Sequence, residues 1–232
     1  MVVVFTLQGD VPLTLVESGS LQPGVIRFEV QQGTSLPVQV KRELEAKFSL
    51  DIAAIKGFHP WATLENDPAW LELCFYCTTR STFYNSSEHT WIRLYELLPR
   101  EDTRGKGDEV FDPLETEERL LDDQPSPENP NPDLRLIAKA LAQFRYDIAE
   151  SLQIAELLPR SFTLSHLQQA FEAIEGIRLH TQNFRRLLMD SGIVEPTGLT
   201  VAQAAGRPAI LYRYASGNSY RRRVRLPRRI PH

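Results

Sequence analysis

The sequence is poor in the residues that build redox centres and metal sites. Its 232 residues include only two cysteines and five histidines, and no histidine falls in a known catalytic pattern. Cys74 and Cys77 form a C-x-x-C motif, but no second Cys/His pair stands nearby at the spacing of a zinc site. They lie in the apolar run LELCFYCTTR, in which residues three apart point to opposite faces of a strand. We interpret both as core residues, with a redox or metal role as the weaker alternative.

Long hydrophobic runs are missing too. No apolar segment approaches the roughly 20 residues that a membrane-spanning helix needs. The opening segment, MVVVFTLQGDVPLTLVE, has neither the basic region nor the small-residue cleavage site of a secretory signal, and it is typical of a strand and a turn. We therefore expect a cytoplasmic protein that has no membrane partner.

Charge is present, but it is unevenly distributed. The net charge is −4, yet residues 1–130 contain 11 basic and 22 acidic residues, whereas residues 131–232 contain 15 and 8. The two parts thus carry −11 and +7, which suggests two domains and places any polyanion on the second. The length of the chain also permits two domains.

Residues 1–100 predict a layered α/β or α+β domain. Short apolar runs separated by turn signals predict strands at residues 2–8, 12–17, 24–30, 71–79 and 91–94. Residues 36–48 predict a helix, because Thr34 and Ser35 precede it as candidate caps and apolar residues recur four apart along it. Strands, one helix and further strands are typical of a sheet covered by helices.

Residues 101–132 differ in composition from the rest of the chain. This segment is acidic and ends in the proline-rich run DDQPSPENPNP, which is typical of a flexible linker. An acidic mimic that competes with DNA for the basic half is the alternative. The pattern becomes helical over residues 133–158, where apolar residues step by three or four and Asp133 follows Pro132 as a candidate N-cap. We expect this helix to connect the two domains.

Residues 159–216 predict a helix-turn-helix followed by a wing. Thr163 is a candidate cap for the first helix, whose apolar stripe ends at Gly176. A short link leads to a second helix from about Thr181 to Asp190. Its predicted inward residues are Phe184, Leu187 and Leu188, and its predicted outward residues are Gln182, Arg185, Arg186 and Met189. In this motif the second helix enters the major groove, where arginine pairs with guanine and Asn or Gln with adenine.

The residues after the second helix are typical of a wing and a basic arm. Strands predicted at 193–195 and 209–214 flank the loop 196–208. The basic tail, residues 217–232, contains six arginines between positions 221 and 229 and suits phosphate contacts or the minor groove. The predicted DNA-binding residues are Thr163, Thr181, Gln182, Asn183, Arg185, Arg186, Arg207, Arg213, Arg221, Arg222 and Arg223. The alternative is that these are ordinary exposed residues on a small helical domain.

Four short motifs stand out in residues 155–214: LLP before FTL, the NFRR core, the GIVEPTG turn and GRPAILYR. With these motifs the segment resembles the C-terminal domain of the Nudix-related transcriptional regulators, a bacterial family. The resemblance implies an α/β (α+β) fold, in which a Nudix-like mixed-sheet sandwich over residues 1–100 precedes a winged helix-turn-helix over residues 159–216.

The same resemblance implies a Nudix box, of which this chain has kept little. Aligned on Arg42-Glu43-Leu44, the box has Thr34 at its upstream glutamate, and Ala46 and Lys47 at its paired glutamates. The glutamates of the family bind a divalent metal, and Mg²⁺ needs several hard oxygen ligands in near-octahedral array. Glu43 alone does not supply that charge, and the ammonium of Lys47 would repel the cation. We therefore predict no catalytic residue, no metal site and no cofactor.

The resemblance also implies a function. It implies a regulator of the type that controls NAD metabolism, expected here to be a repressor, whose inactive Nudix-like domain senses a nucleotide metabolite such as ADP-ribose. Other branches of the family sense a sugar. One recognition helix reads few base pairs, so we expect a two-fold dimer on palindromic double-stranded DNA. The residues themselves leave open the effector, its binding residues, the target genes and the direction of regulation. Three alternatives remain: a first domain that only dimerises, a Nudix pyrophosphohydrolase with an accessory domain, and a winged-helix protein-interaction scaffold.

Overall fold

The strand β1 (Val2–Gln8) lies at the centre of the fold and explains how the other elements are arranged. In the computed structural model, Val2 and Val4 join one hydrophobic cluster, whereas Val3 and Phe5 join another on the opposite face. A strand that is covered on both faces needs an unbroken apolar run, and VVVF supplies it. The structure describes residues 1–18, 23–63, 70–80, 88–102, 104, 131–151, 154, 157–202 and 208–215.

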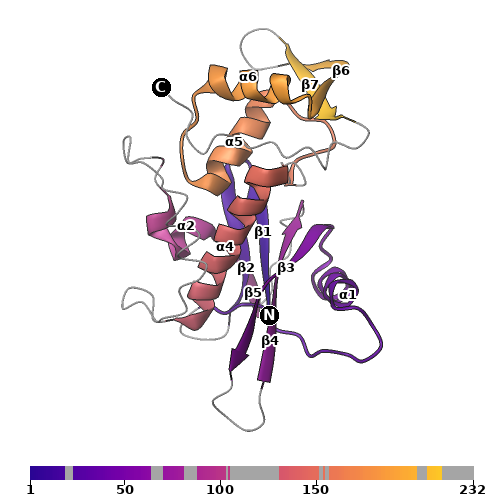
Figure 1. Ribbon diagram of the computed structural model, residues 1–232, viewed down its shortest axis with the longest axis vertical. Coiled ribbons are helices and arrows are strands. Elements are labelled where there is room, and N and C mark those ends of the chain that lie inside the picture. The colour runs from indigo at the N-terminus through magenta and orange to yellow at the C-terminus, as the bar shows by residue number, and fades with distance from the viewer. Residues whose placement is uncertain are drawn as a thin grey trace.

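Four further strands complete a mixed sheet: β2 (Val11–Glu17), β3 (Ile52–Thr63), β4 (Trp70–Thr79) and β5 (His89–Arg93). Their order across the sheet is β3-β4-β1-β2-β5 (Figure 1). β1 pairs in parallel with β4, and every other neighbouring pair is antiparallel. The sheet is therefore mixed, as the resemblance implies.

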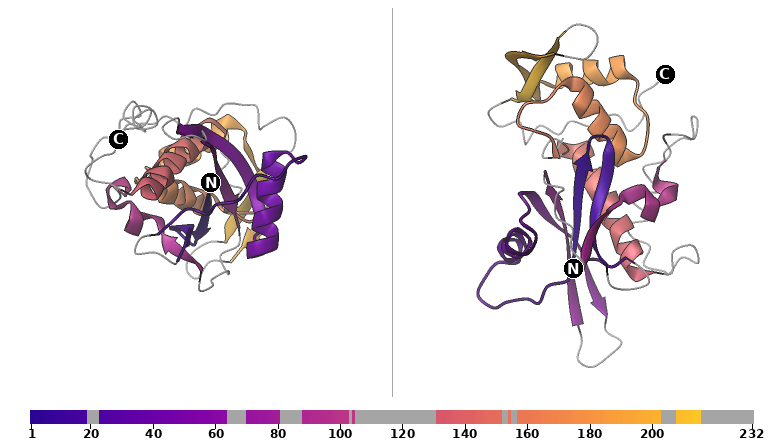
Figure 2. Two further views of the ribbon diagram at one scale, coloured as in Figure 1. Left: turned by 90° about the horizontal axis from the view of Figure 1, so that it is seen from below. Right: turned by 180° about the vertical axis from the view of Figure 1, so that it is seen from behind.

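Helices cover both faces of this sheet. α1 (Leu36–Phe48) covers one face, where its Leu44 is fully buried. α4 (Pro132–Ser151) covers the other face, and its Phe144 stacks on Phe5 with ring centroids 5.6 Å apart. Figure 2 shows the two helices on opposite sides of the sheet. Among the helices that the structure describes, none is long and apolar enough to cross a membrane.

The two cysteines are core residues, as their surroundings in the sequence predict. Cys74 is buried in the cluster on the α4 side of the sheet, and Cys77 is buried in the cluster on the α1 side. They point away from each other because they lie three residues apart on one strand. Burial raises the pKa of the Cys77 thiol, which keeps it protonated.

The C-terminal part has the order helix, helix, strand, strand. α5 (Leu164–Glu175) and α6 (Thr181–Ser191) are followed by β6 (Val194–Val201), which pairs antiparallel with β7 (Ala209–Tyr214). These elements lie beyond one end of the sheet, next to α4 (Figure 1). The fold is thus a mixed-sheet sandwich followed by a winged helix-turn-helix, as the resemblance implies.

One hydrophobic cluster runs through both parts of the molecule. It includes Phe5 of the sheet, Phe144 of α4, Phe171 of α5 and Phe184 of α6. α4 is therefore part of the core on each side of it, rather than a connector alone. The division of the chain stays a prediction, with its segments at residues 1–100, 101–132, 133–158, 159–216 and 217–232. Most of the predicted linker and all of the basic tail lie outside the described residues.

Residues 24–30 are not the strand that their apolar pattern predicts. Only two isolated bridges form there. Side chains supply hydrogen bonds that a neighbouring strand would otherwise make. Gln39 of α1 donates to the carbonyl of Glu29 at 2.6 Å and accepts from the amide of Gln31 at 3.0 Å. The pattern of apolar residues alone does not reveal such long-range partners.

The strand β3 is absent from the sequence-based prediction, although it forms one edge of the sheet. Pro60 interrupts its pattern, and the register with β4 shifts between Phe58 and Trp61. Proline is tolerated there because an edge strand does not need every backbone N–H for pairing.

Two helix starts also differ from the prediction. The strand predicted at 91–94 ends one residue early, where the short helix α2 (Leu94–Leu97) begins. Asp133 is not the N-cap of α4, which starts at Pro132. The side-chain oxygen of Asn131 accepts from the amide of Asp133 at 2.9 Å and takes the capping role.

Candidate nucleic-acid interface

α5 supports the candidate interface. Thr163 caps this helix as predicted, because its hydroxyl accepts from the amide of His166 at 3.1 Å. Gly176 ends the helix in the left-handed region, at a φ of 69°. The predicted apolar stripe is buried throughout, at Leu167, Ala170, Phe171 and Ile174.

A buried polar cluster holds the turn between α5 and α6. Glu172 is only 6% exposed, and its carboxylate accepts from Gln168 Nε2 at 2.8 Å and from the amide of Leu179 at 3.1 Å. Arg178 pairs with the same carboxylate at 2.9 Å, and Gln168 also donates to the hydroxyl of Thr181 at 3.2 Å. These bonds offset the cost of burying the charge. Apolar periodicity does not reveal this cluster, and its one signal in the sequence is the four-residue spacing of Gln168 and Glu172.

α6 is anchored through one face. Phe184 and Leu188 are fully buried, and the ring of Phe184 meets that of Phe171 edge-on with centroids 5.6 Å apart. At the start of the helix, His180 Nδ1 accepts from the amide of Asn183 at 3.5 Å. The helix is therefore fixed against α5, and its other face is directed away from the core.

That outer face of α6 is polar and basic. Arg185 donates to the hydroxyl of Ser165 at 3.1 Å, and Arg186 donates to the side-chain oxygen of Asn183 at 3.5 Å. Both acceptors are neutral, and no carboxylate in the described part of the chain pairs with either guanidinium. The residues predicted to point outward are all exposed: Gln182, Arg185, Arg186 and Met189.

The first strand of the wing is longer than predicted. The sequence predicts a loop from residue 196, whereas β6 continues to Val201. The register with β7 shifts between Pro196 and Thr200, where Gly198 adopts a φ of 79°. A strand can contain residues that do not pair regularly with its neighbour when the register shifts at that point. The run Pro-Thr-Gly, which is typical of a turn, therefore lies within β6.

The remaining predicted contact residues have different surroundings. Thr163 is buried, as expected of a cap, whereas Thr181 is exposed at the start of α6. Arg213 pairs with Glu195 across the wing at 2.9 Å, which reduces its net charge. The positions outside the described residues are Arg207, Arg221, Arg222 and Arg223. DNA contacts by all these residues stay predictions.

α1 carries the residues that align with the Nudix box, and four of its charged side chains form two ion pairs. Arg42 lies 3.7 Å from Glu43, and Lys41 lies 3.6 Å from Glu45. The ammonium of Lys47 is exposed, at the position of a box glutamate. Within the described residues, no group of three or more His, Cys, Asp or Glu side chains is placed to hold a metal ion.

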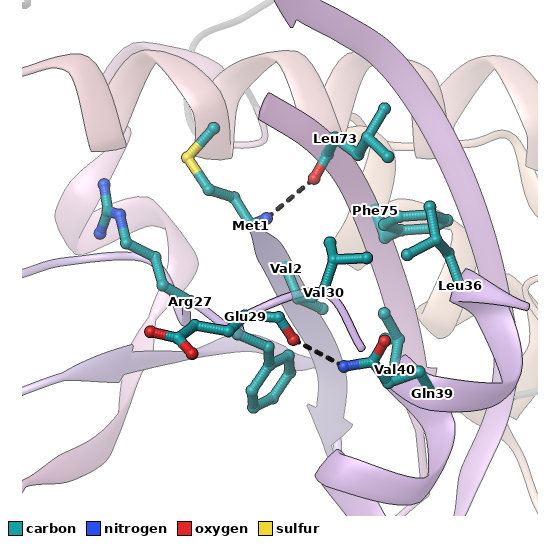
Figure 3. A pocket seen from close by; sticks show the side chains of 11 residues that line it. Met1, Val2, Arg27, Glu29, Val30, Leu36, Gln39, Val40, Leu73 and Phe75 are labelled. Carbon is teal, nitrogen blue, oxygen red and sulfur yellow. Dashed lines mark hydrogen bonds between the residues drawn. The ribbon is translucent and has the colours of Figure 1, made fainter. Parts of the chain in front are cut away.

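A small pocket opens beside the start of α1 (Figure 3). Its volume is about 170 Å³, and apolar side chains such as Leu36 of α1 and Phe75 of β4 line it. Gln39 faces it while donating to the carbonyl of Glu29 at 2.6 Å. Arg27 lies at the edge of the pocket, and its guanidinium forms an ion pair with Asp133 in the first turn of α4 at 2.6 Å.

Comparison with known families identifies the C-terminal part. Residues 154–214 match the family model described as the NrtR DNA-binding winged helix domain. The matched range contains α5, α6, β6 and β7. It coincides with the segment whose motifs resemble the Nudix-related regulators, so that resemblance is confirmed over these residues.

A curated relative supports the same assignment over a limited length. The chain is 38% identical over 80 residues to a protein of Acinetobacter baylyi named ADPR responsive transcriptional repressor NtrR. The match covers 34% of this chain and 32% of that protein. The chain therefore spans about a third of the length of this relative.

Solved structures share the whole fold. The NrtR of Shewanella oneidensis, solved in complex with a 27mer DNA, has a TM-score of 0.67 at 20% identity, over 92% of this chain and 91% of that chain. A MutT/nudix family protein from Enterococcus faecalis has a TM-score of 0.65 at 15% identity, over 93% and 86% of the two chains. At such identities the likeness establishes the fold alone, and a protein solved with DNA and a Nudix family protein share that fold.

Proposed function

We propose that this protein is a sequence-specific, DNA-binding transcriptional repressor whose recognition helix is α6. The observation that carries the proposal is the pair Arg185 and Arg186, which are exposed on a winged helix and bonded only to neutral oxygens in the described part of the chain. An uncompensated guanidinium keeps its attraction for phosphate and for the acceptor edge of guanine. The match of residues 154–214 to a DNA-binding domain family supports the same function.

The two arginines differ in their surroundings, and we assign them different roles. Arg185 reaches back to Ser165 at the start of α5, whereas Arg186 stays beside Asn183 on α6. In a helix-turn-helix the first helix crosses the phosphate backbone and the second enters the groove. Arg186 and Asn183 therefore read base edges, and Arg185 contacts the backbone together with Thr181.

Dimerisation follows from the length of the recognition helix. α6 has 11 residues, and a helix of that length reads only a few base pairs. Two copies related by a two-fold axis double the contacted sequence, so the operator is a palindrome and the working form a homodimer. A protein that binds chromosomal DNA in a bacterium acts in the cytoplasm.

Genomic mapping of binding sites, followed by equilibrium binding to one mapped site and to a random duplex, tests this function. We expect affinity for the mapped site to exceed random affinity by roughly 10³–10⁷. Affinity should fall steeply with salt concentration on both duplexes, because phosphate contacts release counterions. Weak binding without a salt dependence would instead favour a protein-interaction scaffold.

We also propose that the Nudix-like part senses a nucleotide metabolite of the ADP-ribose type, through the pocket beside α1. The matched Acinetobacter relative is named as ADPR responsive. The pocket, about 170 Å³ in volume, is smaller than the roughly 300–1,000 Å³ of typical ligand sites. It therefore fits one ring of a nucleotide as it stands. Entry of a whole nucleotide requires its rim, which includes the exposed Val30, to move (Figure 3).

A ligand that moves the rim shifts DNA binding only if it binds the two conformations with different affinity. Calorimetric titration of ADP-ribose, with and without operator DNA, should therefore give two dissociation constants that differ by roughly 5- to 150-fold. Gln39→Leu should weaken ADP-ribose binding, because Gln39 lines the pocket, whereas Lys41→Ala on the exposed side of α1 should not. Identical affinity with and without DNA would exclude ADP-ribose as the effector, and failure of a wider metabolite screen would then leave this part as a dimerisation scaffold.

We propose finally that the protein does not hydrolyse nucleoside diphosphate derivatives. Ala46 and Lys47 stand where the box has paired glutamates, and Glu43 lies beside Arg42. Incubation with ADP-ribose and Mg²⁺ or Mn²⁺ should release no AMP above background. Multiple turnovers that Glu43→Gln abolishes would show an active Nudix enzyme.

A further inference from the structure

The end of α5 is held by polar side chains from outside the winged helix. Tyr95 of α2, Glu101 of the 3-10 turn η1 (Pro99–Glu101) and Arg145 of α4 converge on it. We call these three residues the clamp. Figure 1 shows α2 beside α4, near the lower end of α5.

Arg145 is the centre of the clamp. Its side chain is 5% exposed, and it donates from Nε to the carbonyl of Ile174 at 2.8 Å. It pairs with the carboxylate of Glu101 at 2.5 Å and donates to the carbonyl of the same residue at 3.0 Å. A buried guanidinium is costly unless its hydrogens are bonded, and these bonds use all three nitrogens. Its position favours the fold further, because the last carbonyls of a helix carry partial negative charge.

Tyr95 binds the same helix end from the other side. Its hydroxyl lies 2.6 Å from the carbonyl of Ala173 and 3.0 Å from that of Ile174, and it accepts from Arg145 at 3.3 Å. Burial raises the pKa of Tyr95, so the phenol keeps the proton that it donates. The guanidinium of Arg104 lies over its ring at 5.3 Å. Arg104 therefore holds the ring of Tyr95 on one face, and hydrogen bonds hold its hydroxyl.

Gly176 shows how closely the two parts approach. A Cβ at this position would overlap the carbonyl oxygen of Glu101, and would also lie 3.1 Å from the hydroxyl of Tyr95. The glycine therefore has two roles. Its φ of 69° ends α5, and its missing side chain makes room for η1.

The clamp has no direct access to DNA, because it lies at the end of α5 and DNA would contact α6. It does fix the direction of α5, and α5 carries α6 through Phe171 and through the cluster around Glu172. Three elements outside the winged helix, α2, η1 and α4, therefore determine how the reading helix is oriented relative to the sheet.

We propose that Tyr95, Glu101 and Arg145 are positioning residues, which set the orientation of the winged helix on the Nudix-like part and thereby the half-site spacing that the protein accepts. The inference rests on the proposed function. In a dimer joined through the Nudix-like parts, the orientation of each winged helix fixes the distance between the two reading helices. Loosening the clamp then relaxes the spacing without removing any DNA contact.

The chain offers matched pairs of variants for the test. Tyr95→Phe removes a hydroxyl that binds α5, whereas Tyr76→Phe removes a hydroxyl that donates to Asp147 of α4. Gly176→Ala combines backbone strain with overlap. Gly9→Ala has a similar φ of 66° and nothing within 4 Å, so it carries the strain alone.

Two measurements on the full-length chain decide the matter. The first is hydrogen exchange of the amides in the last turn of α5. Tyr95→Phe should accelerate it roughly 2- to 10-fold, as the loss of one hydrogen bond predicts, and Tyr76→Phe should not. The second is binding to a series of operators whose half-sites are moved apart in single base-pair steps. The unmodified chain and both controls should prefer one spacing, whereas Tyr95→Phe and Gly176→Ala should bind neighbouring spacings almost equally well.

The outcomes separate this inference from the function on which it rests. Faster exchange with an unchanged spacing profile would overturn the positioning role, because the clamp would then be a local stabiliser only. Equal behaviour of the clamp variants and their controls would overturn it as well. If the unmodified chain binds no DNA, the proposed function fails, while the exchange arm still shows whether the clamp holds α5.

Discussion

Helices α1 and α6 contain similar charged residues and use them in opposite ways. On α1, Arg42 lies 3.7 Å from Glu43, and Lys41 lies 3.6 Å from Glu45. On α6, Arg185 and Arg186 contact neutral oxygens only, among the described residues. The first helix pairs two of its three basic side chains with carboxylates, whereas both arginines of the second face the solvent without a carboxylate partner among the described residues.

This difference shows why basic residues on a helix do not by themselves indicate a binding site. Exposed pairs within a helix contribute little to stability, but they cancel the field that a polyanion would feel. Unpaired guanidinium groups on a rigid support retain that field. Matched changes to the two helices should therefore differ in their effect on DNA binding.

The largest effect should come from the leucines under each helix. Leu44 of α1 and Leu188 of α6 are both fully buried, so alanine at either should lower the free energy of unfolding by about 2–5 kcal/mol. Urea denaturation measures this loss. Leu188→Ala should also weaken DNA binding, because it loosens the recognition helix, whereas folded Leu44→Ala should bind normally. An equal loss of DNA affinity in both variants would contradict the assignment of α6 as the recognition helix.

Removal of one arginine from each helix should give the next largest effect. Arg186→Ala should weaken binding to the mapped operator by about 1–3 kcal/mol if the side chain makes a base contact. Arg42→Ala should leave binding unchanged, because its charge is already paired on α1. Fluorescence anisotropy on operator and random DNA measures both. A similar loss on both duplexes for Arg186→Ala would assign that residue to the phosphate backbone instead.

Acidic pH should lower the stability of the protein through a histidine on the α1 side of the sheet. His89 is buried and meets the ring of Phe48 of α1 at 4.8 Å, and burial lowers its pKa from 6.5. The folded state therefore favours neutral His89. Its contribution to stability is full above pH 6.5 and is lost as the pH falls from 6.5 through the lowered pKa. Urea midpoints across this range should fall for the unmodified chain and fall less for His89→Gln.

The smallest effect should come from the ion pairs on α1. Lys41 and Glu45 are exposed, four residues apart and separated by 3.6 Å. A double-mutant cycle should give a coupling energy of about 0.2–1 kcal/mol that shrinks as salt is added. A coupling of several kcal/mol would mean that α1 depends on its charges far more than its exposure indicates.

Local patterns were sufficient for the elements that are built from local rules. The run VVVF predicted a strand, the four-residue stripe ending at Phe48 predicted α1, and the Thr163 cap with the Gly176 stop predicted α5. The outward face of α6 also followed from its periodicity, because the arginines occupy positions that the buried stripe leaves free. Each of these inferences needs only neighbours along the chain.

Other features depend on partners far away in the sequence, so the sequence did not reveal them. Residues 24–30 do not form the predicted strand, and the side chain of Gln39 bonds the backbone there instead. The strand β3 forms at the edge of the sheet although it contains Pro60. The clamp joins Tyr95 and Arg145 to a helix that lies later in the chain. Nothing in the local composition of these segments encodes such contacts. They arise when the layers pack.

The opposite orientation of Cys74 and Cys77 gives the protein two built-in chemical reporters. A thiol reagent needs access to the sulfur, so a buried cysteine stays unreactive until its surroundings open. Cys74 becomes accessible when the layer shared with α4 opens, and Cys77 when the layer under α1 opens. Mass spectrometry of the labelled peptides, followed over time, would therefore show which side of the sheet opens more often, without any engineered probe.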